Sequence, residues 1–342
     1  MTGERAGSGD DAVDGDAIAA DTAAFRRYLL AKRTVDDRAL DRRLVGLLRE
    51  RLAERAASTA GPLRVLEAGA GVGTMVARLI DREVLPRGET RYVAVDRDAG
   101  ALAGLGPFLR EWAAERDAPT SVDDGGSGDD EADALVVRTD ARTVAVEPVA
   151  ADAVAFAEEH PDEFDALIGM ALLDVLDLGG LDALLGALAS GGTYYFPITF
   201  DGGTRFRPAH PDDRAIERIY HRHMDAKPGG NSRAGGEALA RLREADGSAL
   251  LGVAGSDWVV RPVDEEDGYP GDEAFFLRHI LDTVEDAVGE VIAADGTVTD
   301  PSPLSAADLD DWLVERRRQV DAGELVYLTH QLDLLGRVDG DA

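Results

Sequence analysis

Residues 63–74 read LRVLEAGAGVGT, and this stretch decides the fold because it predicts a buried strand, a glycine-rich turn and the beginning of a helix. The strand is short and apolar. Gly69, Gly71 and Gly73 let the backbone turn sharply and approach a ligand closely, because they carry no Cβ atom. The helix that follows directs unpaired N–H groups toward the turn. The stretch therefore predicts an α/β fold with a ligand site at the turn.

The spacing of the glycines bears on the class of ligand. A dinucleotide fingerprint is G-x-G-x-x-G. Counted from Gly69, its third glycine would stand at position 74, where this chain has Thr74. The glycines instead alternate and follow an acid, Glu67. A tight turn with no ligand could have the same sequence, so the later strands must decide.

Later segments repeat the pattern of an apolar strand that ends in a polar residue. Residues 90–96 predict a second strand ending at Asp96, where a carboxylate of a doubly wound sheet accepts hydrogen bonds from ribose hydroxyls. Residues 135–138 predict a third strand, followed by Asp140. Residues 164–170 and 192–198 predict the fourth and fifth strands. We expect the sixth strand over residues 250–260 and the seventh over residues 324–330.

This order of motifs, over roughly residues 25–336, resembles the class I S-adenosylmethionine (SAM) methyltransferases. The resemblance implies a doubly wound, Rossmann-like sheet of seven strands with SAM as the cofactor. An acid after the third strand, here Asp140, bonds the adenine amino group in that family. The C-terminal segments look similar to parts of uncharacterised bacterial and archaeal members, of haloarchaeal type. The cofactor-binding residues that the resemblance implies are Glu67, Gly69, Ala70, Gly71, Gly73, Asp96, Arg97, Asp140, Ala141, Gly169 and Met170.

The rest of the chain predicts additions to one Rossmann-like domain. Residues 1–16 are expected to be a disordered acidic tail, and residues 17–58 an N-terminal helical lid of two helices separated near residues 34–35. The SAM-binding domain is expected over residues 59–342. Within it, residues 117–133 predict an acidic surface loop, and residues 201–235 and 262–322 predict cap segments.

The acceptor side is less specified by the sequence. Residues 28–38 look similar to a lid-entry segment of some small-molecule methyltransferases, although a solvated helix end explains the same residues. Lys32 is a stronger candidate for a functional residue because it is one of only two lysines in the chain. The residues expected to line the acceptor site are Tyr28, Lys32, Arg38, Asp174, Tyr220 and Asp257.

Methyl transfer from SAM needs a general base only when the acceptor is protonated. His221 or His223 could be that base, oriented by Asp225 or Asp257, and both could equally be ordinary helix residues. Residues 169–172 read GMAL, without the N/D/S-P-P-Y/F/W signature for methylating exocyclic base amines or a glutamine side chain. The favoured acceptor is a small molecule with a hydroxyl or a carboxylate.

Composition excludes several classes of function. The net charge is −31, from 67 acidic and 36 basic residues, and the acids are spread along the whole chain. This favours a solvated surface suited to a cytoplasm of very high salt over an acidic tail that binds a basic partner. It also argues against nucleic-acid substrates, which need clustered cations. The chain has no cysteine, no HExxH spacing and no apolar run of membrane-spanning length, so we expect a cytoplasmic protein without a metal site or membrane segment.

Two other functions remain open at this point. One is a catalytically silent SAM-binding protein on the same fold, against which the retained acids Glu67 and Asp96 argue. The other is an NAD-dependent oxidoreductase, against which the glycine spacing argues. The sequence does not specify the oligomeric state.

Overall fold

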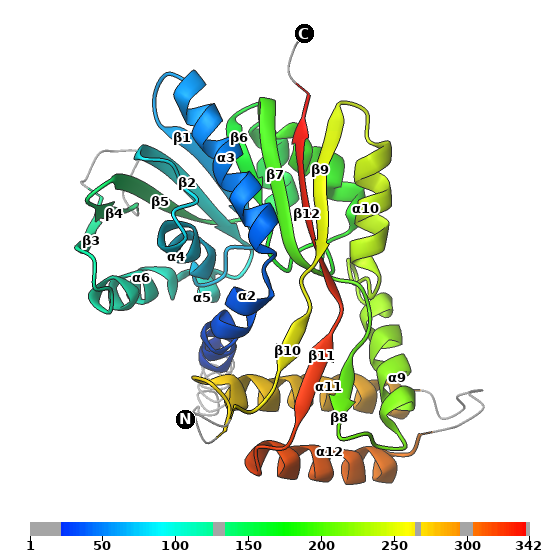
Figure 1. The fold of residues 1–342 in the computed structure, drawn as a ribbon. Helices are drawn as coiled ribbons and strands as arrows, with labels where there is room; N and C mark the ends of the chain where they lie inside the picture. The colour runs from blue at the N-terminus through cyan, green and yellow to red at the C-terminus, as the bar shows by residue number, and fades with distance from the viewer. Residues whose placement is uncertain (1–21, 126–133, 264–267, 295–303, 340–342) are drawn as a thin grey trace, which may run out of the picture.

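A computed structural model describes residues 22–125, 134–263, 268–294 and 304–339, and it contains two β-sheets (Figure 1). The acidic tail expected over residues 1–16 lies outside the described residues, as does the second half of the expected acidic loop. The larger sheet has nine strands in the order β3-β4-β5-β2-β1-β6-β7-β12-β9, and the smaller has three in the order β10-β11-β8.

The core of the larger sheet is the predicted doubly wound, Rossmann-like arrangement. Neighbouring parallel strands are β1 (Leu63–Ala68), β2 (Gly88–Asp96), β5 (Arg142–Ala150), β6 (Phe164–Ile168) and β7 (Leu188–Phe200). Strand β12 (Gln331–Val338) then runs antiparallel between β7 and β9 (Ser248–Gly255). The sheet exceeds the predicted seven strands because a hairpin of β3 (Thr120–Asp124) and β4 (Leu135–Thr139) extends its edge beside β5.

The prediction for the third core strand is wrong. The apolar run at residues 135–138 forms β4, which is antiparallel to both of its neighbours, and β5 is the parallel strand. Part of the expected acidic loop over residues 117–133 is also a strand, β3. Within β5, Pro148 lies beyond the last residue that pairs with β4, so its missing N–H removes no ladder hydrogen bond there.

Helices cover both faces of the larger sheet. One face packs against α3 (Arg42–Ser58), α4 (Thr74–Asp81) and α6 (Leu105–Ala114), and the other against α7 (Ala153–Glu159), α8 (Leu181–Gly186) and α10 (Ala234–Glu244). In β1, Leu63 and Val65 belong to the first apolar layer, and Leu66 and Ala68 to the second. This alternation is what a strand buried on both faces requires.

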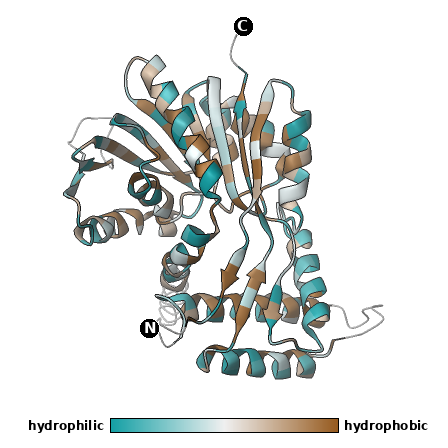
Figure 2. Cartoon of the chain, viewed as in Figure 1, coloured by the Kyte–Doolittle hydropathy of each residue, from teal (hydrophilic) through white to brown (hydrophobic). Residues whose placement is uncertain are grey.

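The smaller sheet continues three strands of the larger one. Strand β8 (Arg205–Arg207) follows β7 in the chain, and β10 (Trp258–Val260) follows β9. Strand β11 (Val326–Thr329) comes directly before β12. Helices α9 (Asp213–Ala226), α11 (Glu273–Ala294) and α12 (Ala306–Asp321) lie beside this sheet, as Figure 1 shows. Figure 2 shows hydrophobic residues along the strands of both sheets and hydrophilic residues over much of α12.

The predictions for the sixth and seventh strands are therefore only partly right. The run at residues 250–260 is not one strand, because it breaks at Ser256–Asp257 between β9 and β10. Most of the run expected as the seventh strand, residues 324–330, is β11 of the smaller sheet. The seventh core strand is β12, which begins immediately after His330.

The N-terminal helices differ from the expected lid. Residues 22–31 are helical, and a turn at Lys32, two residues before the expected separation, divides them from α2 (Arg33–Ala39). A second break follows at Leu40–Asp41. Asp41 begins α3 by accepting a 2.8 Å hydrogen bond from the Leu44 N–H. Helix α3 packs on the face of the sheet. In the part of the chain that the structure describes, no helix is long and apolar enough to span a membrane.

Candidate functional site

A cavity of about 300 Å³ lies where the strand order of the larger sheet reverses, at the carboxyl ends of β1 and β6. Doubly wound sheets bind ligands at this switch point. The cavity is lined by segments that follow β1, β2, β5 and β6 and by one side of the N-terminal helix. Its lining residues are Phe25, Leu29, Lys32, Gly69, Ala70, Gly71, Val72, Thr74, Asp96, Arg97, Asp98, Asp152, Ala153, Met170, Ala171, Leu172, Val175 and Leu176.

The glycine-rich turn forms one wall. Gly69, Gly71 and Gly73 have φ values of +75°, +54° and +82°, a left-handed conformation that side chains disfavour. The Gly71 N–H donates a 2.7 Å hydrogen bond to Asp96 Oδ2, and the Asp98 N–H donates a 2.8 Å bond to Asp96 Oδ1. The Asp96 carboxylate is thus held in a fixed orientation at the cavity. A carboxylate has about four acceptor positions, so both oxygens can accept further bonds from a ligand.

Glu67 lies beneath the turn and is fully buried. Its Oε2 accepts a 2.7 Å hydrogen bond from the Tyr92 hydroxyl. Burial raises the pKa of Glu67 to about 8, although the Tyr92 bond and the charge of Arg78 oppose the increase. Glu67 is not among the residues that line the cavity.

The acid that follows the third core strand is Asp152, not Asp140. Because β4 and β5 are antiparallel, Asp140 and Ala141 lie in the turn before β5, at the opposite end of the sheet from the cavity. Ala141 O accepts a hydrogen bond from the N–H of Gly88, the first residue of β2. Asp152 lines the cavity and caps α7, because its Oδ1 accepts from the Val154 and Ala155 N–H groups at 3.0 Å.

The loop after β6 forms the opposite wall. Met170, Ala171 and Leu172 line the cavity, while Gly169 is buried behind them. A Cβ atom at Gly169 would come within 2.8 Å of the Leu172 side chain and 3.0 Å of Phe196, so a larger residue here would displace the Leu172 side chain, which lines the cavity.

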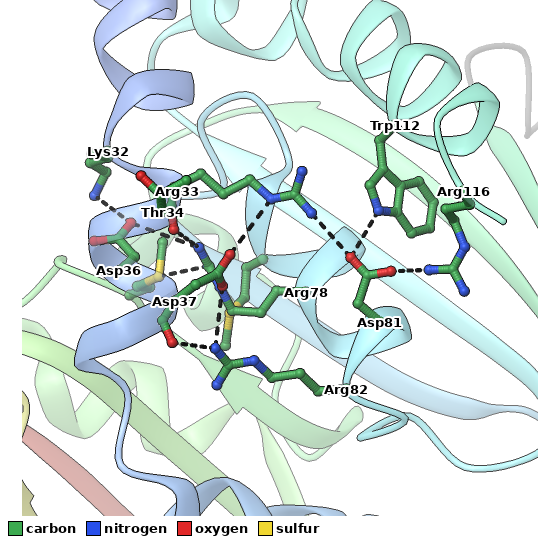
Figure 3. A network of polar contacts seen from close by, with 12 residues as sticks. Lys32, Arg33, Thr34, Asp36, Asp37, Arg78, Asp81, Arg82, Trp112 and Arg116 are labelled. Carbon is green, nitrogen blue, oxygen red and sulfur yellow. Dashed lines mark hydrogen bonds and ion pairs between the residues drawn. The ribbon is translucent and has the colours of Figure 1, made fainter. Parts of the chain in front are cut away.

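A buried network of charges ties the N-terminal helix to this wall (Figure 3). Lys32 lines the cavity, and its Nζ lies 3.5 Å from Oδ2 of Asp36, a fully buried residue. Asp36 Oδ1 accepts a 3.0 Å hydrogen bond from Nε1 of Trp258, whose ring lies 5.6 Å from the Lys32 ammonium. Arg78 of α4 also approaches Asp36 Oδ2, at 3.9 Å.

Three of the expected acceptor-site residues, Tyr28, Asp174 and Tyr220, lie near Lys32, although none of the three is among the residues that line the cavity. Tyr28, Asp174 and Tyr220 are each partly buried and interact electrostatically with one another. Burial raises the pKa of Asp174, and the charge of Lys32 opposes the increase. Asp174 Oδ1 is buried without a hydrogen-bond partner among the described residues. Burial also raises the pKa of Tyr220, to about 12, so its hydroxyl is protonated at neutral pH.

The expected catalytic residues on α9 are not among the residues that line the cavity. His221 Nε2 lies 3.0 Å from the Thr204 hydroxyl, and burial lowers the pKa of His221. His223 Nε2 lies 2.8 Å from Glu290 of α11. Asp225 accepts hydrogen bonds from the backbone and side chain of Ser232.

Two of the expected acceptor-site residues make other contacts. Arg38 forms a two-bond ion pair with the buried Glu273, at 2.6 and 2.8 Å. Asp257 lies at the junction of the two sheets, 2.8 Å from Nδ1 of His330. Within the described residues, no group of three or more His, Asp or Glu side chains could hold a metal ion.

Several lining residues were not predicted from the sequence. Asp98 and Asp152 each precede a helix whose first N–H groups they cap, and an Asp before a helical run is a recognisable signal. The alternating run of residues 142–150 indicates a strand that ends shortly before Asp152, although alternation alone does not show which strand belongs to the core. Phe25, Leu29 and Val175 have no local pattern that separates a cavity wall from an ordinary core contact.

Comparison with known proteins finds similarity in structure alone. No family model and no curated protein matches the chain. A candidate type II methyltransferase from Anaeromyxobacter dehalogenans is 16% identical, with 88% of this chain and 97% of that chain covered, at a TM-score of 0.44. A candidate methyltransferase from Bacillus halodurans is 12% identical, with 85% and 98% covered, at a TM-score of 0.43. The phosphoethanolamine N-methyltransferase 2 of Haemonchus contortus, solved with S-adenosyl-L-methionine, is 13% identical, with 86% and 52% covered, at a TM-score of 0.36.

Proposed function

We propose that this chain is a SAM-dependent methyltransferase acting on a small molecule. The observation that carries the proposal is the charge of the cavity around the glycine turn. Three carboxylates, Asp96, Asp98 and Asp152, line the cavity together with two cations, Lys32 and Arg97. A dinucleotide would bring a pyrophosphate with two negative charges into this acidic lining. SAM instead carries two positive groups, a sulfonium and an ammonium, and one carboxylate.

The strand order also favours SAM over a dinucleotide. Dinucleotide-binding sheets have the order 3-2-1-4-5-6. Without the hairpin β3–β4, the larger sheet has the chain order 3-2-1-4-5-7-6, with antiparallel β12 inserted between β7 and β9. The alternative of an NAD-dependent oxidoreductase is therefore opposed by the glycine spacing, the charge and the topology.

Each cavity group has a role in this proposal. Asp96, held by Gly71 and Asp98, accepts hydrogen bonds from the ribose hydroxyls. Asp152 accepts from the adenine amino group, the role that the resemblance implied for Asp140. The turn from Gly69 to Gly71 and the loop at Met170 enclose the methionine part of SAM. When bound, SAM supplies a methyl group on a sulfonium, and the protein must orient the acceptor toward it and exclude water.

We place the acceptor beside Lys32, Tyr28, Asp174 and Tyr220. The unpartnered Oδ1 of Asp174 is suited to accept a hydrogen bond from an O–H or N–H group of the acceptor. For a hydroxyl acceptor, the oxygen forms a bond to the methyl carbon as the carbon–sulfur bond breaks, and the proton passes to Asp174. His221 is the second candidate for the base, because its lowered pKa keeps the imidazole neutral at pH 7.

Calorimetric titration of the purified chain with SAM, S-adenosylhomocysteine and NAD tests the proposal. SAM should bind and NAD should not. Asp96→Ala should weaken SAM binding by about 10- to 100-fold, because hydrogen bonds to a charged group contribute about 1.5–3 kcal/mol. Asp140→Ala is the matched control and should bind SAM as the parent does. Equal effects of the two substitutions, or tight NAD binding, would show that the cavity is assigned to the wrong ligand.

A second experiment separates an enzyme from a silent SAM-binding protein. Release of S-adenosylhomocysteine is measured with matched sets of alcohols, phenols, carboxylic acids and amines. An active acceptor allows Asp174→Asn and His221→Asn to be compared across pH, and the larger loss in kcat identifies the base. SAM binding without release from any set would favour the silent alternative.

A further inference from the structure

The end of β7 has a strained backbone close to the cavity. Ile198 has φ = +57° and Ala171, on the neighbouring loop, has φ = +49°. A β-branched residue in the left-handed region is a genuine outlier, since its side chain crowds the backbone there. Ile198 is also buried, with 1% of its surface exposed. Strain of this kind persists only where the surrounding contacts enforce it, and it concentrates at functional sites.

The two strained residues are coupled through one hydrogen bond. The Ala171 N–H donates to the carbonyl oxygen of Pro197 at 3.0 Å. Ala171 lines the cavity between Met170 and Leu172, which also line it. The backbone of β7 at Pro197, next to Ile198, is thus hydrogen-bonded directly to the wall of the cavity.

A buried carboxylate on β12 supports the strained segment. The pairing of β7 with β12 shifts register at one point. There two residues of β7, Pro197 and Ile198, lie opposite one residue of β12, Asp333, and this irregularity is a β-bulge. Asp333 Oδ1 accepts the Ile198 N–H at 3.0 Å and thus replaces the backbone acceptor that the bulge removes. Oδ2 accepts from the Tyr195 hydroxyl at 2.8 Å and from the Asp41 N–H at 3.0 Å.

Asp333 has no exposed surface and does not line the cavity. Three donors converge on its carboxylate from β7 and from the residue that caps α3. A buried carboxylate is an energetically costly way to stabilise a bulge, because burying a charge is unfavourable unless the charge is paired or well hydrogen-bonded. The three converging donors suggest that the geometry at Ile198 matters beyond folding.

We propose that Asp333 is a positioning residue for the cofactor: it holds Ile198 in the left-handed conformation and, through Pro197 and Ala171, fixes the cavity wall that contacts SAM. The inference rests on the proposed function only in taking SAM as the ligand of this cavity.

Asp333→Asn in the full chain tests the inference, with Asp165→Asn as the matched control. Asp165 is an equally buried aspartate with two partners, the Arg55 side chain and the Arg64 N–H, at the amino end of the sheet away from the cavity. Both variants should lose thermal stability. We expect SAM binding, measured calorimetrically on folded protein, to weaken tenfold or more in Asp333→Asn and less than twofold in Asp165→Asn. Equal affinities in the two variants would overturn the inference.

A rescue distinguishes positioning from general damage. Glycine adopts the left-handed region without steric cost. Adding Ile198→Gly to Asp333→Asn should therefore recover at least threefold in SAM affinity, although it removes a buried side chain. A purely structural role predicts a double variant that is weaker than either single one. The parent protein serves as the reference. If the parent does not bind SAM, the proposed function is wrong. If the parent and Asp333→Asn bind SAM equally tightly, only the positioning role of Asp333 is wrong.

A second pair of substitutions, which disturb the structure less, tests the inference if Asp333→Asn does not fold. Tyr195→Phe removes one of the three donors to Asp333 and keeps the carboxylate. Tyr194→Phe is its control, because the Tyr194 hydroxyl lies 2.9 Å from Ser248 Oγ instead. We expect a two- to fivefold loss of SAM affinity in the first variant and no loss in the second. The same affinity in both variants counts against the positioning role.

Discussion

The Nε of Arg78 donates a 2.5 Å hydrogen bond to Oδ1 of Asp37, and this contact joins α4, the helix after the glycine turn, to α2. Arg78 is 2% exposed, and its guanidinium also approaches Sδ of Met170 at 3.2 Å. One buried cation therefore contacts both α2, which follows the helix that lines the cavity, and the loop after β6, which forms a wall of it.

Replacing Arg78 should be costly for this reason. Arg78→Met keeps the apolar stem but leaves Asp36 with Lys32 as its remaining nearby cation. Breaking a buried ion pair by removing one partner costs about 3–5 kcal/mol, and the partial exposure of Asp37 favours the lower end. Urea unfolding should show the loss. Arg51→Met, at a surface pair with Glu54, is the control and should cost less than about 1 kcal/mol. Comparable losses in both variants would show that the network adds little.

The sequence was sufficient for the part of the fold whose signals are local. The turn after β1, the strand ending at Asp96 and the fourth strand follow from hydrophobic runs and the residues that end them. These patterns lie within one element, so no knowledge of distant contacts was needed.

The errors concern features of the fold that depend on which strands pair with each other. Residues 135–138 and 142–150 are both strands, and only their antiparallel pairing shows that the second is the core strand. The position of Asp140 followed from that choice, so it was wrong for the same reason. Similarly, β11 and β12 are separated by His330 alone, and nothing in the run itself indicates that the chain passes from one sheet to the other. The bulge that brings Asp333 to Ile198 is a register effect between strands distant in sequence.

Asp152 should matter for ligand binding separately from its role as a helix cap. Serine also caps helices well, so Asp152→Ser should retain most of the stability of α7, whereas Asp152→Ala should lose about 1 kcal/mol. Both variants lose the carboxylate in the cavity, and both should bind SAM about five- to tenfold more weakly in calorimetric titrations. If Asp152→Ser bound SAM as the parent does, the proposed contact with adenine would be wrong.

Glu67 should make stability depend on pH in a specific direction. Its pKa rises from an ordinary value of 4.5 to about 8 on folding. Between these values the folded state binds more protons than the unfolded state, so the free energy of unfolding should fall as pH rises, by at most about 1.4 kcal/mol per pH unit. The contribution is fully present below pH 4.5 and is lost as pH passes 8.

Denaturant unfolding of Glu67→Gln between those two pH values checks this dependence. Glutamine resembles the protonated acid, so the variant should be more stable than the parent near pH 8 and should have a flatter pH profile. Glu89→Gln, at an exposed position of β2, should retain the parent profile. A parent profile no steeper than that of Glu67→Gln would contradict the raised pKa.

The net charge of −31 predicts that the fold gains stability from salt. Like charges repel more strongly in the compact state, and the screening length falls from about 30 Å at 0.01 M to about 3 Å at 1 M. Salt also weakens surface ion pairs, such as the contacts of Arg317 with Asp282 and Glu285. Each such pair contributes only about 0–1 kcal/mol, and 67 acids face 36 bases, so the relief of repulsion should dominate.

Melting temperatures measured from 0.01 M to 2 M KCl decide between these opposing effects. We expect a rise, with most of it below about 0.3 M if screening is the cause, because the screening length changes little beyond that concentration. Sucrose, which is excluded from protein surfaces but carries no charge, provides the comparison for general stabilisation by cosolutes. A melting temperature that stays level or falls on addition of KCl would show that the acidic surface is already compensated by the ion pairs of the fold. The interpretation of the acidic surface as suited to very high salt would then be wrong.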